Sequence, residues 1–178
     1  MPKLSRDPLL AAAQLVLAVM VGLLMLTIAL VAIGAIAVVT FQRASIAARI
    51  ADAGLADVFG VWGLFAGLLA VCGVLFMALC FVITLGEIVK SVDEGDPFIP
   101  ANARRLTQMG WLALAIQVGA SVLVFGQARL ESLMGSAEPP ANATGTMVGG
   151  VMLVLILFIL ARVFRKGTEM REDLEGTV

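Results

Sequence analysis

The chain has 178 residues, of which 61% are hydrophobic and 14% are charged, and its mean hydropathy is +1.04. This composition excludes an ordinary water-soluble domain, in which about half of the residues are apolar and about a quarter are charged. The net charge of −1, with no concentrated basic segment, argues against direct binding to nucleic acid.

Four long stretches of the sequence carry no charged residue, and each reaches or approaches the length that crosses a hydrocarbon core about 30 Å thick. Because backbone polar groups inside a bilayer must be paired internally, these stretches are expected to be helices. The sequence therefore predicts an all-α fold: one domain over residues 1–178, built as an integral membrane bundle of four transmembrane helices with a short C-terminal helical tail. The predicted spans are 15–39, 58–85, 109–127 and 146–164, and the tail is 165–178.

The first span follows Lys3 and Arg6, as the apolar core of a secretory signal would. Its apolar run is longer than the about 7 to 15 residues of such a core, so we interpret it as an uncleaved span. The second span holds both cysteines, Cys72 and Cys80, which are about 12 Å apart along a helix and therefore too distant for a disulfide.

Small residues in two spans have the spacing that allows helices to approach closely. GxxxG spacing could pack the second span against the fourth, although it also arises by chance. The residues concerned are Gly60, Gly63, Gly67, Gly145 and Gly149.

Gln117 lies well inside the third span, and the span centres contain no ionisable residue that would mark a proton or ion pathway. Its amide would most simply bond to a neighbouring helix. The alternative is a ligand site or a path for an uncharged solute, lined by Gln117, Ser121 and glycines.

The segment between the second and third spans has the composition of a structured turn. Gly95 can adopt the positive φ that ends a helix, Pro97 disfavours a helix at the residue before it, and Pro100 suits the first turn of the next helix. Phe98 and Ile99 are expected to pack back against the bundle.

The sequence contains no recognisable catalytic constellation, because histidine, a buried carboxylate pair and a phosphate-binding loop are all missing. We therefore expect no enzymatic activity, with a membrane-facing site at Glu87 as the one exception to test. No cofactor is expected either, since two cysteines without histidine suit neither zinc nor haem. Asp93, Glu94 and Asp96 could hold a hard cation, but acids beside a helix-ending glycine are more often solvated.

Lysine and arginine are distributed unequally between the two ends of the predicted spans. By the positive-inside rule, the end with nine basic residues, which includes both termini and the second loop, faces the cytoplasm (N-in/C-in). The nine are Lys3, Arg6, Lys90, Arg104, Arg105, Arg162, Arg165, Lys166 and Arg171, and the opposite end has Arg43, Arg49 and Arg129.

The tail begins with basic residues and ends with acidic ones. Arg162, Arg165 and Lys166 are expected to anchor the fourth helix at anionic lipid headgroups, each contributing about 1 kcal/mol. The acids beyond them would be repelled by that surface and point into the cytosol, beside the apolar pair Met170 and Leu174. A topological stop followed by a solubilising end is an equally simple interpretation.

Two segments resemble a bacterial family of uncharacterised membrane proteins, the domain-of-unknown-function family 2975 (DUF2975). A departure is Ile99 before Pro100, where family members often have a serine that caps the helix. The first segment comprises Val92, Gly95, Pro97, Phe98, Asn102, Arg104, Arg105, Leu106, Gly110 and Trp111, and the second comprises 161–165 with 170–178. The resemblance implies a multi-pass protein of the bacterial inner (cytoplasmic) membrane, often encoded beside a small Xre/Cro-type helix-turn-helix regulator, and no established activity.

These observations predict a non-enzymatic membrane-bound regulator that binds a cytosolic helix-turn-helix transcription factor through its second loop and tail. Arg104 and Arg105 would pair with carboxylates of the partner. The tail would contribute Glu169, Met170, Glu172, Asp173, Leu174 and Glu175. One alternative is that the two arginines pair with the tail acids of the same chain. Another is a small channel or transporter component for an uncharged solute, and a homo-oligomer is compatible with either.

Overall fold

The computed structural model describes residues 8–41, 61–133 and 143–175, which form four α-helices and one short turn. The described residues contain no strand, and all four helices are long and apolar enough to cross a membrane. Both the all-α class and the number of spanning helices are therefore confirmed. The helices are α1 (Pro8–Phe41), α3 (Val61–Asp93), α4 (Pro100–Leu133) and α5 (Ala143–Glu175).

Each helix extends beyond the span predicted for it. α3 continues past residue 85 to Asp93, and α4 begins at Pro100, nine residues before the start of its predicted span. α5 runs without interruption from the apolar stretch into the charged segment, so residues 165–175 of the predicted tail form the last turns of α5. Residues 176–178 of that prediction lie outside the described residues. Hydropathy marks where the apolar stretch ends, whereas a helix ends where a residue such as Gly95 or a proline stops it.

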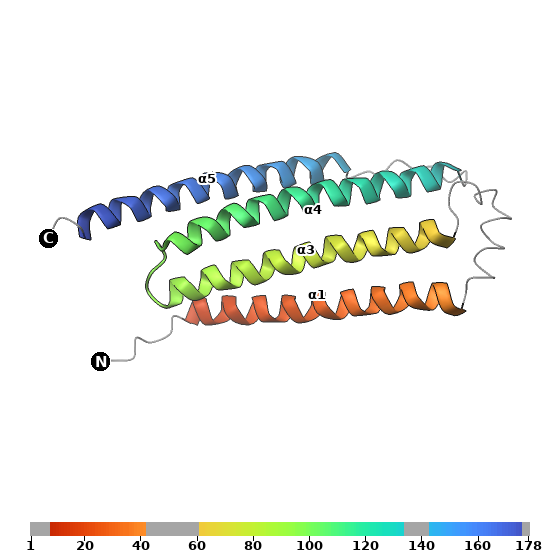
Figure 1. Cartoon of the computed structure of the whole chain (residues 1–178), viewed down its shortest axis with the longest axis horizontal. Coiled ribbons are helices and arrows are strands. Elements are labelled where there is room, and N and C mark those ends of the chain that lie inside the picture. The colour runs from red at the N-terminus through yellow and green to blue at the C-terminus, as the bar shows by residue number, and fades with distance from the viewer. Residues whose placement is uncertain (1–7, 42–60, 134–142, 176–178) are drawn as a thin grey trace.

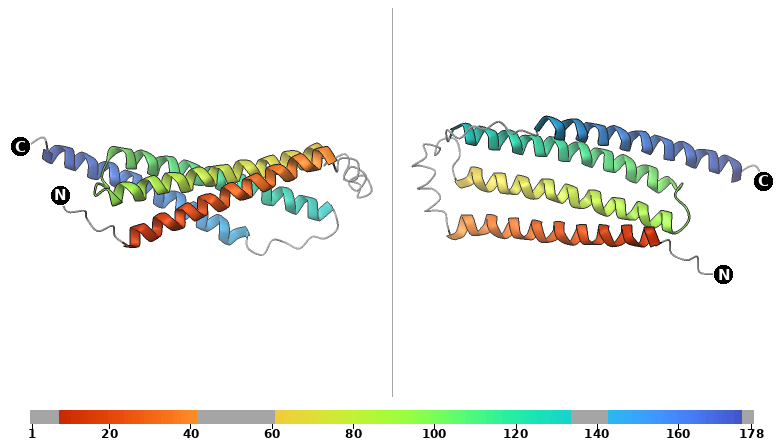
Figure 2. Two further views of the ribbon diagram at one scale, coloured as in Figure 1. Left: turned by 90° about the horizontal axis from the view of Figure 1, so that it is seen from below. Right: turned by 180° about the vertical axis from the view of Figure 1, so that it is seen from behind.

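The four helices form an open row rather than a closed bundle. Close approach of Cα atoms joins α1 to α3, α3 to α4 and α4 to α5, in the order that Figure 1 shows. α1 and α5 lie at the two edges of this layer, as the view from behind in Figure 2 also shows. The start of α1, the α3–α4 turn and the end of α5 lie at one end of the layer (Figure 1).

The buried core joins α3, α4 and α5, in the half of the layer nearest the turn. Among the described side chains of α1 only Ala35 is buried, and α1 contributes no residue to this core. In a bilayer that is no defect, since lipid chains cover apolar side chains as well as protein does. The core comprises Ile88, Leu106, Met109, Ala113, Val154, Leu157 and Ala161, with Phe81, Leu85, Phe158 and Phe164 packed against it.

The GxxxG spacing does not bring α3 and α5 together, because α4 lies between them. A Cβ atom built on Gly67 or Gly149 would meet nothing within 4 Å. Gly60 and the surroundings of Gly145 lie outside the described residues.

Glycines of α4, the central helix, make close contacts instead. A Cβ atom on Gly110 would lie 3.1 Å from the Phe158 ring of α5, and one on Gly119 would lie 2.8 Å from Cγ2 of Val74 in α3. A missing side chain therefore lets each neighbour pack directly on the α4 backbone. The cysteines of α3, Cys72 and Cys80, are free, as their spacing predicts.

Candidate functional site

The α3–α4 turn is fixed by backbone hydrogen bonds and one glycine. Gly95 has φ of 88°, which confirms the predicted positive φ, and its N–H donates to the carbonyl oxygen of Val92 at 3.1 Å. The N–H of Asp96 donates to the carbonyl oxygen of Ser91 at 3.2 Å. α4 then begins at Pro100, as predicted.

Asn102, in the first turn of α4, is the buried centre of this turn. Its side chain is fully buried, and Nδ2 donates to Ser91 Oγ at 2.6 Å and to the carbonyl oxygen of Pro97 at 2.9 Å. Ser91 Oγ in turn donates to the carbonyl oxygen of Ile88 at 2.7 Å. The sequence alone indicated no separate role for Asn102, which belongs to the first segment that resembles the DUF2975 family. Its position two residues after a helix-starting proline was the signal for an amide that reaches back to the turn.

Arg105 completes the network from α4 to α3. Its Nε donates to Glu87 Oε2 at 2.8 Å, and its Nη1 donates to Asn102 Oδ1 at 3.1 Å. The Arg105 side chain is 28% exposed. Arg105 therefore makes its contacts with α3 and the turn, whereas the alternative hypothesis paired it with the tail acids.

The end of α5 is held against the α3–α4 turn by aromatic packing. The rings of Phe98 and Phe164 lie 5.2 Å apart between centroids. Phe98 also lies over Gly167, where a Cβ atom would come within 2.8 Å of Cδ1 of the ring. Thr168 Oγ1 lies 2.9 Å from the carbonyl oxygen of Phe164 and 3.4 Å from that of Phe98. This contact confirms that Phe98 packs back against the helices.

An ion pair adds a second link between α5 and the turn. Nη1 of Arg171 donates to Oδ1 of Asp96, and both side chains are about half exposed. The turn is thus tied to the fourth spanning helix, as one alternative proposed, but through Arg171 rather than through Arg104 or Arg105.

The remaining residues predicted to bind a partner lie mostly on exposed surface. Arg104, Met170, Glu172 and Asp173 are exposed, and Glu169 pairs with Lys166 at 3.2 Å. The side chains of Leu174 and Glu175 lie outside the described part of the chain, although their backbone belongs to α5.

A shallow groove of about 250 Å³ runs between the start of α4 and the end of α5. It brings Arg104 close to two of the predicted tail acids without an ion pair between them among the described residues. The groove is lined by Pro100, Ala103, Arg104, Arg165, Thr168, Glu169 and Glu172.

The residues predicted to anchor the helix at lipid headgroups follow directly after the buried Ala161. Arg162, Arg165 and Lys166 are all exposed on α5. Their role at the membrane surface stays a prediction.

The acids of the turn each have a neighbour within the chain. Asp93 accepts a hydrogen bond from Gln14 Nε2 at 3.4 Å, and Glu94 lies 4.0 Å from Lys90 Nζ. Within residues 8–41, 61–133 and 143–175, no group of three His, Cys, Asp or Glu side chains is arranged to hold a metal ion.

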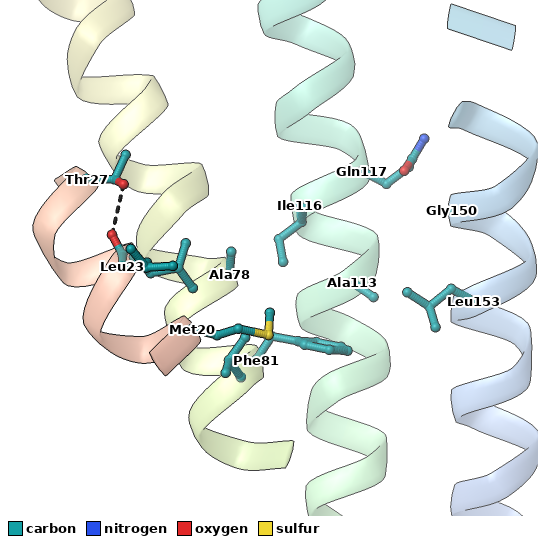
Figure 3. A pocket seen from close by; sticks show the side chains of 12 residues that line it. Met20, Leu23, Thr27, Ala78, Phe81, Ala113, Ile116, Gln117, Gly150 and Leu153 are labelled. Carbon is teal, nitrogen blue, oxygen red and sulfur yellow. Dashed lines mark hydrogen bonds between the residues drawn. The ribbon is translucent and has the colours of Figure 1, made fainter. Parts of the chain in front are cut away.

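A second candidate site lies further along the layer, where all four helices border an apolar groove of about 460 Å³ (Figure 3). Its two polar side chains are Thr27 and Gln117, and Oγ1 of Thr27 donates to the carbonyl oxygen of Leu23 at 2.9 Å. The lining residues are Met20, Leu23, Leu24, Thr27, Ala78, Phe81, Val82, Ala113, Ile116, Gln117, Gly150 and Leu153.

Gln117 reaches from α4 toward α5, as Figure 3 shows. Its carboxamide packs directly on Gly150, where a Cβ atom would clash with Oε1. The hydrogen bond from Gln117 to a neighbouring helix, which the sequence predicted, is not found among the described residues. The amide contacts α5 by packing on Gly150 instead. Ser121 donates to the backbone carbonyl oxygen of Gln117 at 2.8 Å and does not line the groove.

Comparison with curated proteins and with solved structures finds no match to this chain. The family described as a protein of unknown function, DUF2975, matches residues 46–178, which include both segments that carried the resemblance. Since this match covers well over half of the sequence, the chain belongs to the DUF2975 family.

Proposed function

We propose that this protein is a non-enzymatic regulator of the bacterial inner membrane that binds a cytosolic helix-turn-helix transcription factor. The binding surface is the exposed side of the last turns of α5, together with Arg104 beside it. The observation that carries the proposal is that α5 continues as one helix past its apolar stretch and is held there by the α3–α4 turn.

A helix held in place is a better docking element than a free tail, because less conformational entropy is lost when a partner binds. Phe98 and Asp96 contact one side of α5 through Gly167 and Arg171. Met170, with 58% of its surface exposed, is available as an apolar contact, with Glu169 before it and Arg171 and Glu172 after it in the sequence.

The charge of this surface fits a DNA-binding partner. Glu172 and Asp173 are exposed acids, and a DNA-reading surface is basic. Complementary charge would speed the encounter and orient the partner. A factor whose basic surface is covered in this way cannot bind its operator, so binding at the membrane would compete with binding to DNA.

The distribution of basic residues supports a cytoplasmic location for this end. Nine of the twelve lysines and arginines belong to the end that contains the turn and both termini, which is the pattern of a cytoplasmic side. Arg162, Arg165 and Lys166 would then lie at anionic headgroups and fix the depth of α5.

Solute transport has less support. The apolar groove is lined on α1 from Met20 to Thr27, which is about 10 Å along the helix axis. A path across the membrane would need to extend over about 30 Å. The groove therefore favours a bound molecule over a passage.

The docking proposal is tested with two charge-changing double variants at the same end of the molecule. Met170→Lys with Glu172→Lys changes the proposed surface. Val92→Lys with Glu94→Lys makes a matching change of charge at two exposed positions at the end of α3, Val92 in its last turn and Glu94 directly after it. Affinity for the helix-turn-helix protein encoded beside the gene is measured on purified protein in nanodiscs. We expect the α5 variant to bind more than tenfold more weakly and the α3 variant to bind within twofold of the unmodified protein. Equal affinities in all three proteins would reject the proposal.

A further inference from the structure

Gln117 occupies the middle of the membrane-spanning part of α4. Twelve residues separate it from Arg105 on one side and from Arg129 on the other, which is about 18 Å along the helix in each direction. Charged residues at the two ends of a spanning helix lie near the two surfaces of the bilayer. Gln117 therefore lies close to the bilayer midplane.

A carboxamide at this depth needs a hydrogen-bonding partner, because the hydrocarbon core supplies none. The Gln117 side chain is half-buried, and it makes no side-chain hydrogen bond among the described residues. The ester and headgroup oxygens of lipids lie at the bilayer surfaces, about 15 Å from the midplane. Ordinary lipid chains in the groove would therefore leave this amide unsatisfied.

The groove beside Gln117 has the size and lining of a site for a small apolar molecule. Its volume of about 460 Å³ lies within the range of small-molecule sites, which is about 300–1,000 Å³. Apolar side chains from all four helices surround it, including Met20 and Phe81 on one side and Leu153 on the other (Figure 3). No charged residue lines it, so a neutral occupant is required.

The polar groups beside the groove determine which hydrogen-bonding group an occupant can use. Both Oε1 and Nε2 of Gln117 lie next to Gly150, and neither atom makes a hydrogen bond among the described residues. Nε2 is therefore a donor that still needs an acceptor. The other polar side chain of the groove, Thr27, already donates to Leu23. An occupant that brings an acceptor can bond to Gln117 Nε2.

We propose that this groove binds a neutral, membrane-soluble small molecule whose carbonyl oxygen accepts a hydrogen bond from Gln117 Nε2. Aliphatic or aromatic parts of the molecule pack against α1 and α3, and the carbonyl group lies beside Gly150 at the α4–α5 contact. This site is independent of the docking surface proposed at the end of α5.

The test compares two probes that differ in their carbonyl groups, a benzoquinone with a decyl chain and decylbenzene. Each is titrated against the full-length protein, and bound molecules are counted by native mass spectrometry. The unmodified protein should bind one quinone at least fivefold more tightly than decylbenzene, the factor expected for one hydrogen bond. Gln117→Met, which keeps the length of the side chain, should remove this preference. Gln108→Met, the same change at an exposed position of α4, should retain it.

A third variant separates the volume of the groove from its polarity. Ala78→Leu adds bulk to the lining and should weaken the binding of both probes, with the circular dichroism spectrum and melting temperature unchanged. The proposal is overturned if the unmodified protein does not prefer the quinone, or if Gln117→Met retains the preference. If Gln117→Met retains the preference and also converts a dimer to a monomer, the amide bonds to a second copy of the chain rather than to a small molecule.

Discussion

At the scale of single residues, Asn102 shows how a polar side chain can specify a turn. Both of its amide hydrogens are donated, to Ser91 and to Pro97, and its oxygen accepts from Arg105. A buried amide with all these contacts stabilises the turn. Removing it leaves several of its partners without a hydrogen bond. Because Asn102 is fully buried, such a loss is more costly than at an exposed site.

Replacing Asn102 by alanine is therefore expected to destabilise the protein by about 2 kcal/mol, since it leaves the carbonyl oxygen of Pro97 without its donor. The midpoint of unfolding in detergent mixtures measures the effect. Gln108→Ala, an exposed change in the same helix, should stay within about 0.5 kcal/mol of the unmodified protein. Equal midpoints for both variants would show that the Asn102 network contributes no stability.

Gly167 allows a further prediction, because Phe98 occupies the space where its side chain would be. Gly167→Ala should displace the Phe98 ring and loosen the end of α5, which hydrogen–deuterium exchange detects as faster exchange at residues 168–175. Gly149→Ala makes the same change in the same helix at a position with open space, and there the gain in helix propensity should slow exchange or leave it unchanged. The prediction fails if the two variants exchange alike at the end of α5.

At the scale of helices, the contact between α5 and the turn includes an ion pair whose positive and negative side chains can be swapped between the two segments. Arg171→Glu should loosen the end of α5 and cost up to about 1 kcal/mol, because half-exposed ion pairs contribute little. Combining Asp96→Arg with Arg171→Glu restores opposite charges and should restore slow exchange at residues 168–175. If the combined variant exchanges as fast as Arg171→Glu alone, the pair does not hold the helix.

The sequence predicted the number and class of the helices and the residues of the turn, because apolar length, Gly95 and the prolines are local signals. It did not predict that the helices form an open row, nor which helices are neighbours in it. Spanning helices are apolar on their lipid-facing and protein-facing sides alike, so hydropathy does not mark which face packs. Gly110 and Gly119 make the close contacts, although the GxxxG spacing pointed to other glycines. Asn102 was missed as the centre of the turn because its partners become neighbours only when the turn folds.

At the scale of the whole molecule, α5 connects the two proposed sites. Gly150 borders the groove and Met170 lies on the docking surface, twenty residues or about 30 Å further along the same helix. Between them, α5 packs on α4 through Val154, Leu157 and Ala161. A molecule that entered the groove would therefore contact the helix that presents the docking surface.

The orientation of the whole layer in the membrane gives the last prediction. Glu94, directly after the end of α3, and Glu172, in the last turns of α5, are both exposed. The end of α3 and the end of α5 lie at the same end of the layer (Figure 1). The excess of basic residues at this end indicates the cytoplasmic side. In a background with both natural cysteines replaced, Glu94→Cys and Glu172→Cys should resist a membrane-impermeant maleimide in intact spheroplasts and react after permeabilisation.

Ala51→Cys, in the predicted outer segment between the first two spans, should react in the intact spheroplasts and serves as the control. Reaction of both inner positions in intact spheroplasts, with Ala51→Cys protected, would reverse the orientation and reject docking of a cytosolic partner at α5. The two inner positions must in any case respond alike, because the end of α5 is held to the turn that follows Glu94 by the contacts of Phe98 with Phe164 and of Arg171 with Asp96. A difference between them would contradict the arrangement of the helices itself.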